Sequence, residues 1–171
     1  MSVEPPPLRR AAFAFAQLAL AALVALVAPA CDADDDDAPV GYVIDFPSTA
    51  AAVASDSIKV YLFSPAENDC ATLIQARRAG SLLPPARAET KAMAPCELLS
   101  GGGALTVDVG DAIVFGVAQR RGEDFLVGCT SRRLDASTSE LTLSLTPFTN
   151  TVAVPTTACI ALSDKCAGRC E

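Results

Sequence analysis

Seven cysteines constrain the fold of this 171-residue chain more than any other feature of its sequence. Cys31 directly follows an apolar run, and the others are spread over the rest of the chain: Cys70, Cys96, Cys129, Cys159, Cys166 and Cys170. An even set of cysteines in an exported chain indicates a disulfide framework, because oxidising compartments favour paired thiols. With Cys31 set aside, we expect three disulfides among the other six.

The positions of these six cysteines restrict their pairing without deciding it. Cys159, Cys166 and Cys170 form an odd group near the end of the sequence. Complete pairing therefore requires at least one bond from this group to the preceding domain. We expect Cys129 to pair with Cys70 or Cys96, which would tie a helix or a long loop to a central strand. Each bond would stabilise the fold by roughly 2–4 kcal/mol.

Metal binding and redox chemistry are the functional alternatives for the cysteines. The spacing of Cys159, Cys166 and Cys170 does not match the paired C-x₂₋₄-C spacing of zinc sites, and the sequence has no His to complete one. Cys166 and Cys170 are also one residue too far apart for a redox C-x-x-C motif. The sequence therefore predicts no metal site and no cofactor.

The N-terminus has the pattern of a secretory signal peptide over residues 1–30. Arg9 and Arg10 precede residues 11–30, which are all apolar except Gln17 and Pro29. A positive segment, an apolar stretch and small residues at the exit are typical of a cleaved signal. A retained membrane helix is the alternative, because about 20 apolar residues suffice to span a bilayer.

The exit of this segment, Val-Ala-Pro-Ala-Cys at residues 27–31, resembles the lipobox of bacterial lipoproteins. The resemblance implies that Cys31 is lipidated and becomes the first residue of the mature protein. Ala28 and Pro29 depart from the family pattern, which has Leu three positions before the Cys and a small residue other than Pro two before it. An ordinary signal, cleaved near a Cys31 that forms a disulfide, remains the alternative.

Five aspartates lie within residues 31–38, directly after Cys31. They fail as a calcium loop of the EF-hand type, because Asp37 and Val43 occupy the positions of the required Gly and Glu. Like charges in a row stay solvated and extended, so we expect an acidic tether. From Ala38 onward the chain has 14 acidic and 11 basic residues, so its overall acidity says little about a ligand.

Residues 39–150 show the alternation of a β domain. Ile58, Val60 and Leu62 share one face of a predicted strand, and Leu141, Leu143 and Leu145 share a face of another. Further strands are expected over residues 40–46, 112–119 and 125–131, the 112–119 strand being apolar on both faces and therefore central. A polar turn containing Gly122 should join the last two of these strands as a hairpin.

One helix is expected near Cys70. Ser64 and Glu67 have the spacing of a capping box, which predicts a start there, and a short helix that begins only near Asp69 is the alternative. Gly80 provides a stop. Residues 81–95 predict a long loop, with room for one edge strand, and residues 151–171 predict a Cys-rich tail.

The order of these strands resembles the transthyretin-like or carboxypeptidase-regulatory-like β-sandwich of bacterial envelope proteins. Residues 40–63 are similar to that family's first hairpin, and residues 105–119, 125–130 and 140–147 to its final strands. An immunoglobulin-like sandwich is the competing topology. The expected fold is therefore mainly β, an antiparallel sandwich with one short helix and a disulfide-rich tail. The resemblance implies a binding or spacer module and not a catalyst.

The motifs of common enzymes are absent from the sequence. It has no His and no Trp, no G-x-S-x-G elbow and no phosphate loop. Tyr42 and Tyr61 both lie in predicted strands, where core packing is the expected role. We therefore expect no enzymatic activity and no catalytic residues, a hydrolase of unknown type being a remote alternative.

Three basic pairs are the remaining feature that bears on a partner: Arg77-Arg78, Arg120-Arg121 and Arg132-Arg133. They predict solvated surfaces or, alternatively, contact with an anionic polymer or an envelope protein. Nucleic acid is disfavoured by the net charge of −7. The expectation is a non-enzymatic lipoprotein held at the bacterial envelope, at the outer membrane or cell surface rather than the inner membrane. An unlipidated secreted or periplasmic accessory protein or inhibitor is the alternative.

Overall fold

The computed structural model describes residues 38–101, 103–135 and 137–170. The expected signal peptide, Cys31 and nearly all of the acidic tether lie outside the described residues. The described part is mainly β, with two sheets, as the sequence predicts. The three-stranded sheet has the order β4-β1-β7, formed by Ala104–Val107, Ala38–Asp45 and Glu140–Ser144. The five-stranded sheet has the order β3-β2-β5-β6-β8, formed by Ala88–Glu89, Ser57–Phe63, Gly110–Arg120, Glu123–Leu134 and Thr146–Pro147.

The described residues form four short helices, so the expectation of one helix was wrong. They are α2 (Thr49–Ala54), α3 (Cys70–Arg78), α4 (Pro95–Leu99) and α5 (Leu162–Cys166). The expected helix is α3, and it takes the shorter form. Asp69 is its N-cap and accepts hydrogen bonds from the Thr72 amide at 2.9 Å and the Thr72 hydroxyl at 2.7 Å. Gly80 follows its C-terminus with φ +67°.

Two expectations about strand pairing were also wrong. β1 pairs with β7 in parallel, from Gly41 opposite Glu140 to Asp45 opposite Ser144, so the sandwich is not wholly antiparallel. A parallel pair needs a long crossover, and the strands of the second sheet supply it. The predicted first hairpin does not form, because β1 and β2 belong to different sheets and α2 lies between them. The predicted hairpin of β5 and β6 is present.

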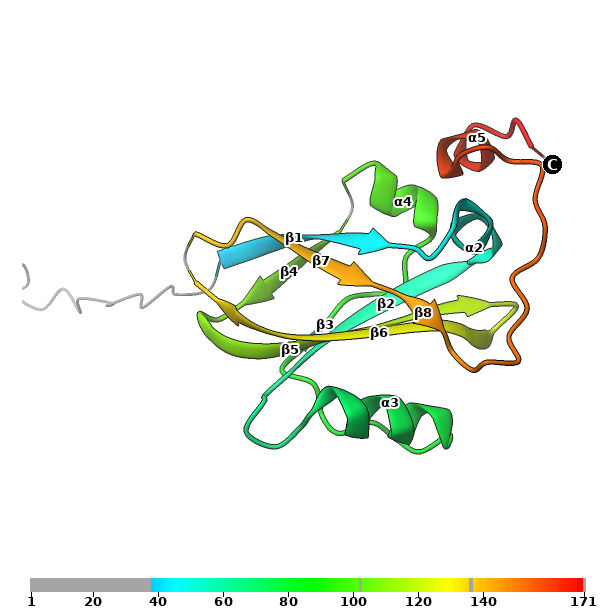
Figure 1. Cartoon of the computed structure of the whole chain (residues 1–171). Helices are drawn as coiled ribbons and strands as arrows, with labels where there is room; N and C mark the ends of the chain where they lie inside the picture. The colour runs from blue at the N-terminus through cyan, green and yellow to red at the C-terminus, as the bar shows by residue number, and fades with distance from the viewer. Residues whose placement is uncertain (1–37, 102, 136, 171) are drawn as a thin grey trace, which may run out of the picture. The chain divides into compact units, whose positions relative to one another are not determined.

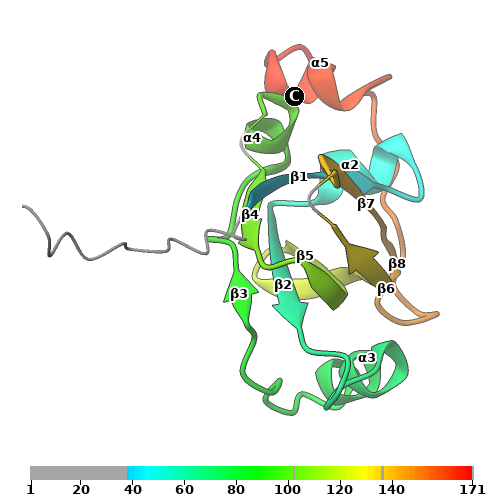
Figure 2. The ribbon, with the colours of Figure 1, turned by 90° about the vertical axis from the view of Figure 1, so that its left-hand side faces the viewer.

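The five-stranded sheet is buried on both faces at β5, as expected for a central strand. Its inner face packs against the leucines of β7 and the apolar residues of β1 and β4. Its outer face carries Phe63, Phe115 and Val117 against Leu73 of α3. Figure 1 shows the result as three layers, with α3 on the side of the large sheet opposite β1, β4 and β7, and Figure 2 shows the same layers from the side.

A pair of glycines allows the two sheets to approach closely. Gly116 and Gly128 are cross-strand partners in β5 and β6. A Cβ atom at Gly116 would collide with the side chain of Leu143, and one at Gly128 with the carbonyl oxygen of Ser144. The chain then passes through Leu145 from β7 in one sheet to β8 in the other, which joins the sheets along one side.

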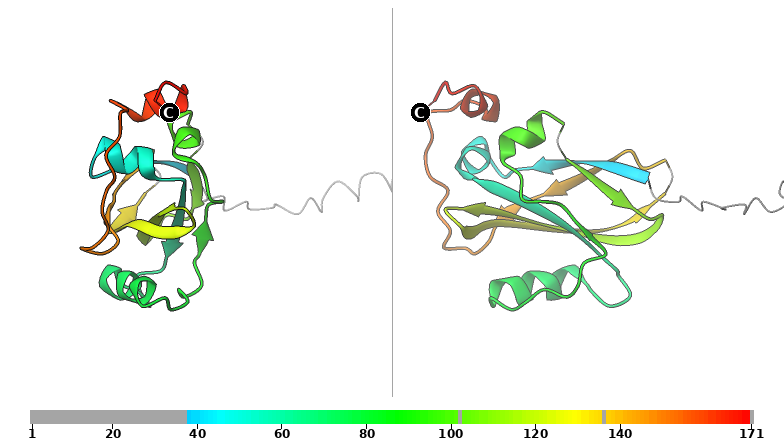
Figure 3. Two further views of the ribbon diagram at one scale, coloured as in Figure 1. Left: turned by 90° about the vertical axis from the view of Figure 1, so that its right-hand side faces the viewer. Right: turned by 180° about the vertical axis from the view of Figure 1, so that it is seen from behind.

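Three disulfides join all six cysteines of the described residues. Cys70–Cys129 fixes α3 to β6, Cys96–Cys166 fixes α4 to α5, and Cys159–Cys170 closes the tail on itself. Of the two partners left open for Cys129, the structure has Cys70, and the Cys96 bond is the required link from tail to domain. Figure 3 shows the tail running along the side of the sandwich to α5, which lies beside α4 and α2.

Candidate functional site

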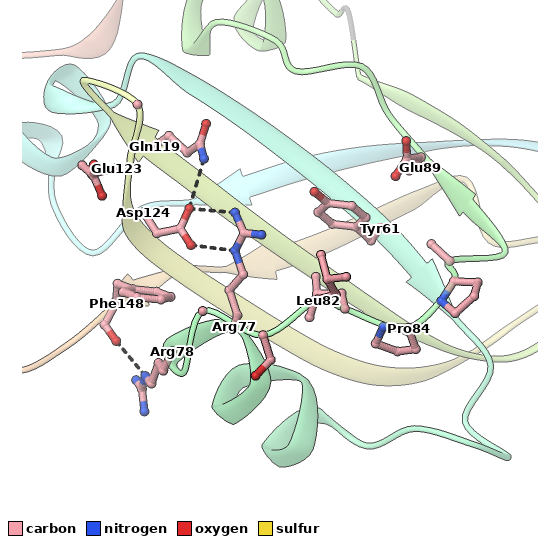
Figure 4. Close-up of a pocket in the computed structure, with 16 residues that line it drawn as sticks. Tyr61, Arg77, Arg78, Leu82, Pro84, Glu89, Gln119, Glu123, Asp124 and Phe148 are labelled. Atoms are coloured by element: carbon pink, nitrogen blue, oxygen red, sulfur yellow. Dashed lines mark hydrogen bonds and ion pairs between the residues drawn. The ribbon is translucent and has the colours of Figure 1, made fainter.

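A groove of about 780 Å³ lies between α3, the segment 80–86 and the hairpin of β5 and β6; we call it the α3 groove. Its walls are Arg77 and Arg78 of α3, Leu82, Leu83, Pro84, Pro85 and Ala86 of the following segment, Gln119, Glu123 and Asp124 of the hairpin, Tyr61, Glu89 and Phe148. Figure 4 shows these side chains arranged around the opening. The volume is in the range of sites that hold small molecules or peptide segments.

An ion pair fixes one wall of the α3 groove. The Arg77 guanidinium donates two hydrogen bonds to the Asp124 carboxylate, at 2.6 and 2.9 Å, and the Gln119 amide donates a third at 3.1 Å (Figure 4). The hydrogen bond to Asp124 raises the pKa of Arg77 above its ordinary value. Two-point contacts of this kind fix orientation as well as distance. Together with Cys70–Cys129 they hold α3 rigidly on the sheet.

Tyr61 contributes an aromatic surface to the same groove, although sequence reasoning assigned it to core packing. Its ring stacks on Phe63 with centroids 6.1 Å apart, and the Lys59 ammonium lies 5.0 Å from the ring centroid. Lys59 also pairs with Glu89 at 3.0 Å, which raises the pKa of the lysine. Leu82, at 97% exposure, stands almost free on the rim. The α3 groove thus combines apolar walls with charged groups, of which Arg77, Asp124 and Glu89 have ion-pair partners within the protein.

Nucleophilic and metal-ligating groups are sparse in the part of the α3 groove that the structure describes. Among the described residues that line it, Ser81 carries the only aliphatic hydroxyl, and the sequence has no His to activate that group. Within the described ranges, no cluster of Cys, Asp and Glu could hold a metal ion.

A second, apolar groove of about 530 Å³ lies at the other side of the sandwich; we call it the β1 groove. It is lined by Tyr42, Val43, Ile44 and Phe46 of β1 and its end, Ser48, Thr49 and Ala52 of α2, Pro95, Leu98 and Leu99 of α4, and Ala161 and Leu162 of α5. This site is hard to predict from the sequence, because three of its walls are helices of five or six residues. The usable signals were Ser48 as an N-cap and Pro95 followed by Glu97, whose carboxylate accepts from the Ala94 amide at 3.0 Å.

The three basic pairs do not form one surface. Arg77-Arg78 lie in the α3 groove, where Arg78 donates to the carbonyl oxygen of Phe148 at 2.7 Å, and Arg120-Arg121 lie at the nearby β5–β6 turn. Arg132-Arg133 lie at the far end of β6, roughly 30 Å along the strand at about 3.4 Å per residue. Since Asp124 neutralises Arg77, the described residues present no continuous basic face built from the three pairs.

The comparisons with known proteins leave the site to be interpreted from its geometry. No family model, no curated protein and no solved structure matches this chain. No helix among the described residues has the length and apolar character needed to cross a membrane. The three disulfides are compatible with an extracellular or envelope location.

Proposed function

We propose that this protein is a non-enzymatic lipoprotein of the bacterial envelope, anchored through Cys31, which presents a disulfide-stabilised binding domain on an acidic tether. The α3 groove is its partner-binding surface. The observation that carries the proposal is the construction of that groove. Its aromatic and apolar lining rests on elements held by a disulfide and a two-point ion pair, and preorganised surfaces of this kind favour binding.

The anchor is supported by the sequence around Cys31 and by the cysteine pairing. All six other cysteines have partners in disulfides, so Cys31 has no obligatory thiol partner within the chain. The aspartates that follow it provide a solvated spacer between a lipid and β1. Outer-membrane or surface placement is proposed on the same basis.

Metabolic labelling with a palmitate analogue tests the anchor. We expect labelling of the wild-type protein and its loss in Cys31→Ala, with the variant released from the membrane fraction. Cys129→Ala is the matched control and should keep its label, provided the variant accumulates. Equal labelling of wild type and Cys31→Ala, or none in either, contradicts the anchor and favours the unlipidated alternative.

Photocrosslinking in intact cells tests the α3 groove. A photoreactive residue in place of Leu82 should capture one defined partner, whereas the same residue in place of Val109, an exposed apolar position that lines neither groove, should not. Adding Tyr61→Ala should reduce capture at position 82. The same products from both positions would show that the α3 groove is not the binding surface.

A further inference from the structure

One edge of strand β1 pairs with β7 over its second half, from Gly41 to Asp45, and the other edge pairs with β4 over its first half only. β4 covers the first half of the second edge, from Ala38 opposite Val107 to Gly41 opposite Ala104. Beyond that point the Tyr42 amide still donates to the Gly103 carbonyl oxygen at 3.3 Å. No strand among the described residues pairs with the rest of this edge.

The hydrogen bonds of β1 show which main-chain groups face the uncovered edge. On the β7 side, the Gly41 amide donates to Ser139 at 3.1 Å, and the Asp45 carbonyl accepts from Leu145 at 2.8 Å. Successive residues of a strand direct their N–H and C=O groups to opposite edges. The amide and carbonyl of Ile44 therefore face the same edge as the Tyr42 amide, where β4 has already ended.

This uncovered edge opens into the β1 groove. Tyr42, Val43 and Ile44 line the groove, and so do Leu98 and Leu99 of α4. Val43 is 45% exposed and Leu99 58% exposed, which leaves apolar side chains beside main-chain groups that no strand of the described residues pairs. An acyl chain would satisfy the side chains alone, whereas an extended peptide would satisfy both.

The walls of the β1 groove are held in place from outside the sheet. Cys96–Cys166 ties α4 to α5, so two of the helices that line the groove are covalently linked. The Lys165 ammonium of α5 donates to the carbonyl oxygens of Val53 and Ser55, at 2.5 and 3.1 Å, and so fixes α5 to the C-terminal end of α2. A rigid, partly apolar slot beside a strand edge is therefore built into the domain.

We propose that the β1 groove binds an extended peptide segment of another protein, which adds to the free edge of β1 as a strand and places apolar side chains at alternate positions against α4. The added strand continues along the same edge on which β4 already pairs, so the segment extends an existing strand interface. Strand addition of this kind obtains affinity from main-chain hydrogen bonds and specificity from side-chain pockets. The α3 groove plays no part in it.

Hydrogen exchange on the full oxidised protein in detergent tests the proposal. The probe is the acetylated, amidated peptide Lys-Thr-Val-Thr-Val-Thr, and its matched control carries N-methyl groups on both valines. The control keeps every side chain and loses two main-chain donors. We expect the unmodified peptide to slow exchange in the fragment that contains Ile44 and the methylated peptide to leave it unchanged. Equal protection by both peptides, or by neither up to about 1 mM, overturns the proposal.

A pair of matched variants locates the peptide. Leu99→Glu should weaken peptide binding by roughly tenfold or more, because it places a carboxylate on an apolar wall of the β1 groove. Leu82→Glu makes the same change at an exposed leucine of the α3 groove and should leave peptide affinity unaltered. Equal affinities of the two variants would overturn the proposal, and so would displacement of the peptide by palmitate. A dimer formed through this edge, detected by light scattering, would also overturn it.

Discussion

Tyr42 carries a polar hydroxyl into the core, and no described residue forms a hydrogen bond with it. The residue is 6% exposed, and its hydroxyl has no hydrogen-bond partner among the described residues. Burial raises the pKa of Tyr42, and the nearby Thr90 side chain opposes that shift less strongly. A buried hydroxyl without a partner lowers stability relative to an apolar replacement of the same shape.

Tyr42→Phe is therefore expected to stabilise the protein by about 1 kcal/mol in chemical denaturation. Thr90→Val is the contrasting variant, since the Thr90 hydroxyl accepts from the buried Val60 amide at 3.0 Å. Loss of that acceptor should destabilise by about 1–3 kcal/mol. A loss of stability in Tyr42→Phe would show that its hydroxyl has a partner in solution.

Gly128 is the residue at which the sheet contact is least tolerant of change. A Cβ there would meet main-chain as well as side-chain atoms, whereas one at Gly116 would meet only the end of a leucine side chain. We expect Gly128→Ala to destabilise by about 1–3 kcal/mol and Gly116→Ala by less, as measured by denaturation. The reverse order would show that β7 moves away from β6 more easily than Leu143 changes its rotamer.

At the scale of elements, the sequence predicted strands better than helices. β2 and β7 follow from apolar alternation and β5 from a continuous apolar run, and both patterns depend only on a strand's own residues. Helices of five or six residues, such as α2 and α4, are too short to show a helical period. The parallel partner of β1 was not predictable either, because pairing depends on residues a hundred positions away.

For the candidate sites, single residues could be recognised in the sequence, whereas the grooves that they form could not. Tyr61 and the pair Arg77-Arg78 stand out in the sequence. Tyr61 was expected to pack in the core, however, and the two arginines to lie on solvated surfaces. Their meeting in one groove depends on α3 being held over the sheet by Cys70–Cys129. The β1 groove was missed because its walls come from three separate segments of the chain, residues 42–52, 95–99 and 161–162.

The disulfides should differ in their contribution to stability according to the length of chain they close. Cys70–Cys129 spans 59 residues and Cys159–Cys170 spans 11. Loop-closure entropy gives roughly 4 kcal/mol for the first and roughly 3 kcal/mol for the second. Paired Cys→Ser variants compared by thermal unfolding should show the larger loss for Cys70 and Cys129. The opposite order would indicate that the unfolded chain keeps structure near these cysteines.

For the molecule as a whole, three aspartates contribute to the response to acid. The pKa values of Asp69, Asp135 and Asp164 lie below their ordinary value of 3.8. The main causes are hydrogen bonds from the Thr72 hydroxyl, the Ser137 hydroxyl and the Ala161 amide respectively. A carboxyl with a lowered pKa in the folded state stabilises above its unfolded pKa, and the contribution is lost as pH falls through the folded value.

The free energy of unfolding should accordingly stay level through neutral and mildly acidic pH as far as these groups are concerned, and decline below about pH 4. Asp69→Asn, combined with Asp135→Asn, should flatten that acid decline when both proteins are titrated by denaturation. A wild-type protein whose stability rises from pH 5 to pH 3 would contradict this account.

The pairing of the cysteines also has a consequence for the order in which the protein matures. During synthesis Cys96 follows Cys70 and precedes Cys129, the native partner of Cys70. The first two thiols of the domain to emerge are therefore not partners, and Cys96 must wait for Cys166, close to the end of the sequence. Oxidation of a growing chain would favour the wrong bond first, and reshuffling of disulfides takes seconds to hours without strong catalysis. A cell that makes this protein efficiently is expected to depend on a disulfide isomerase, and the β1 groove would be the last part of the domain to be completed.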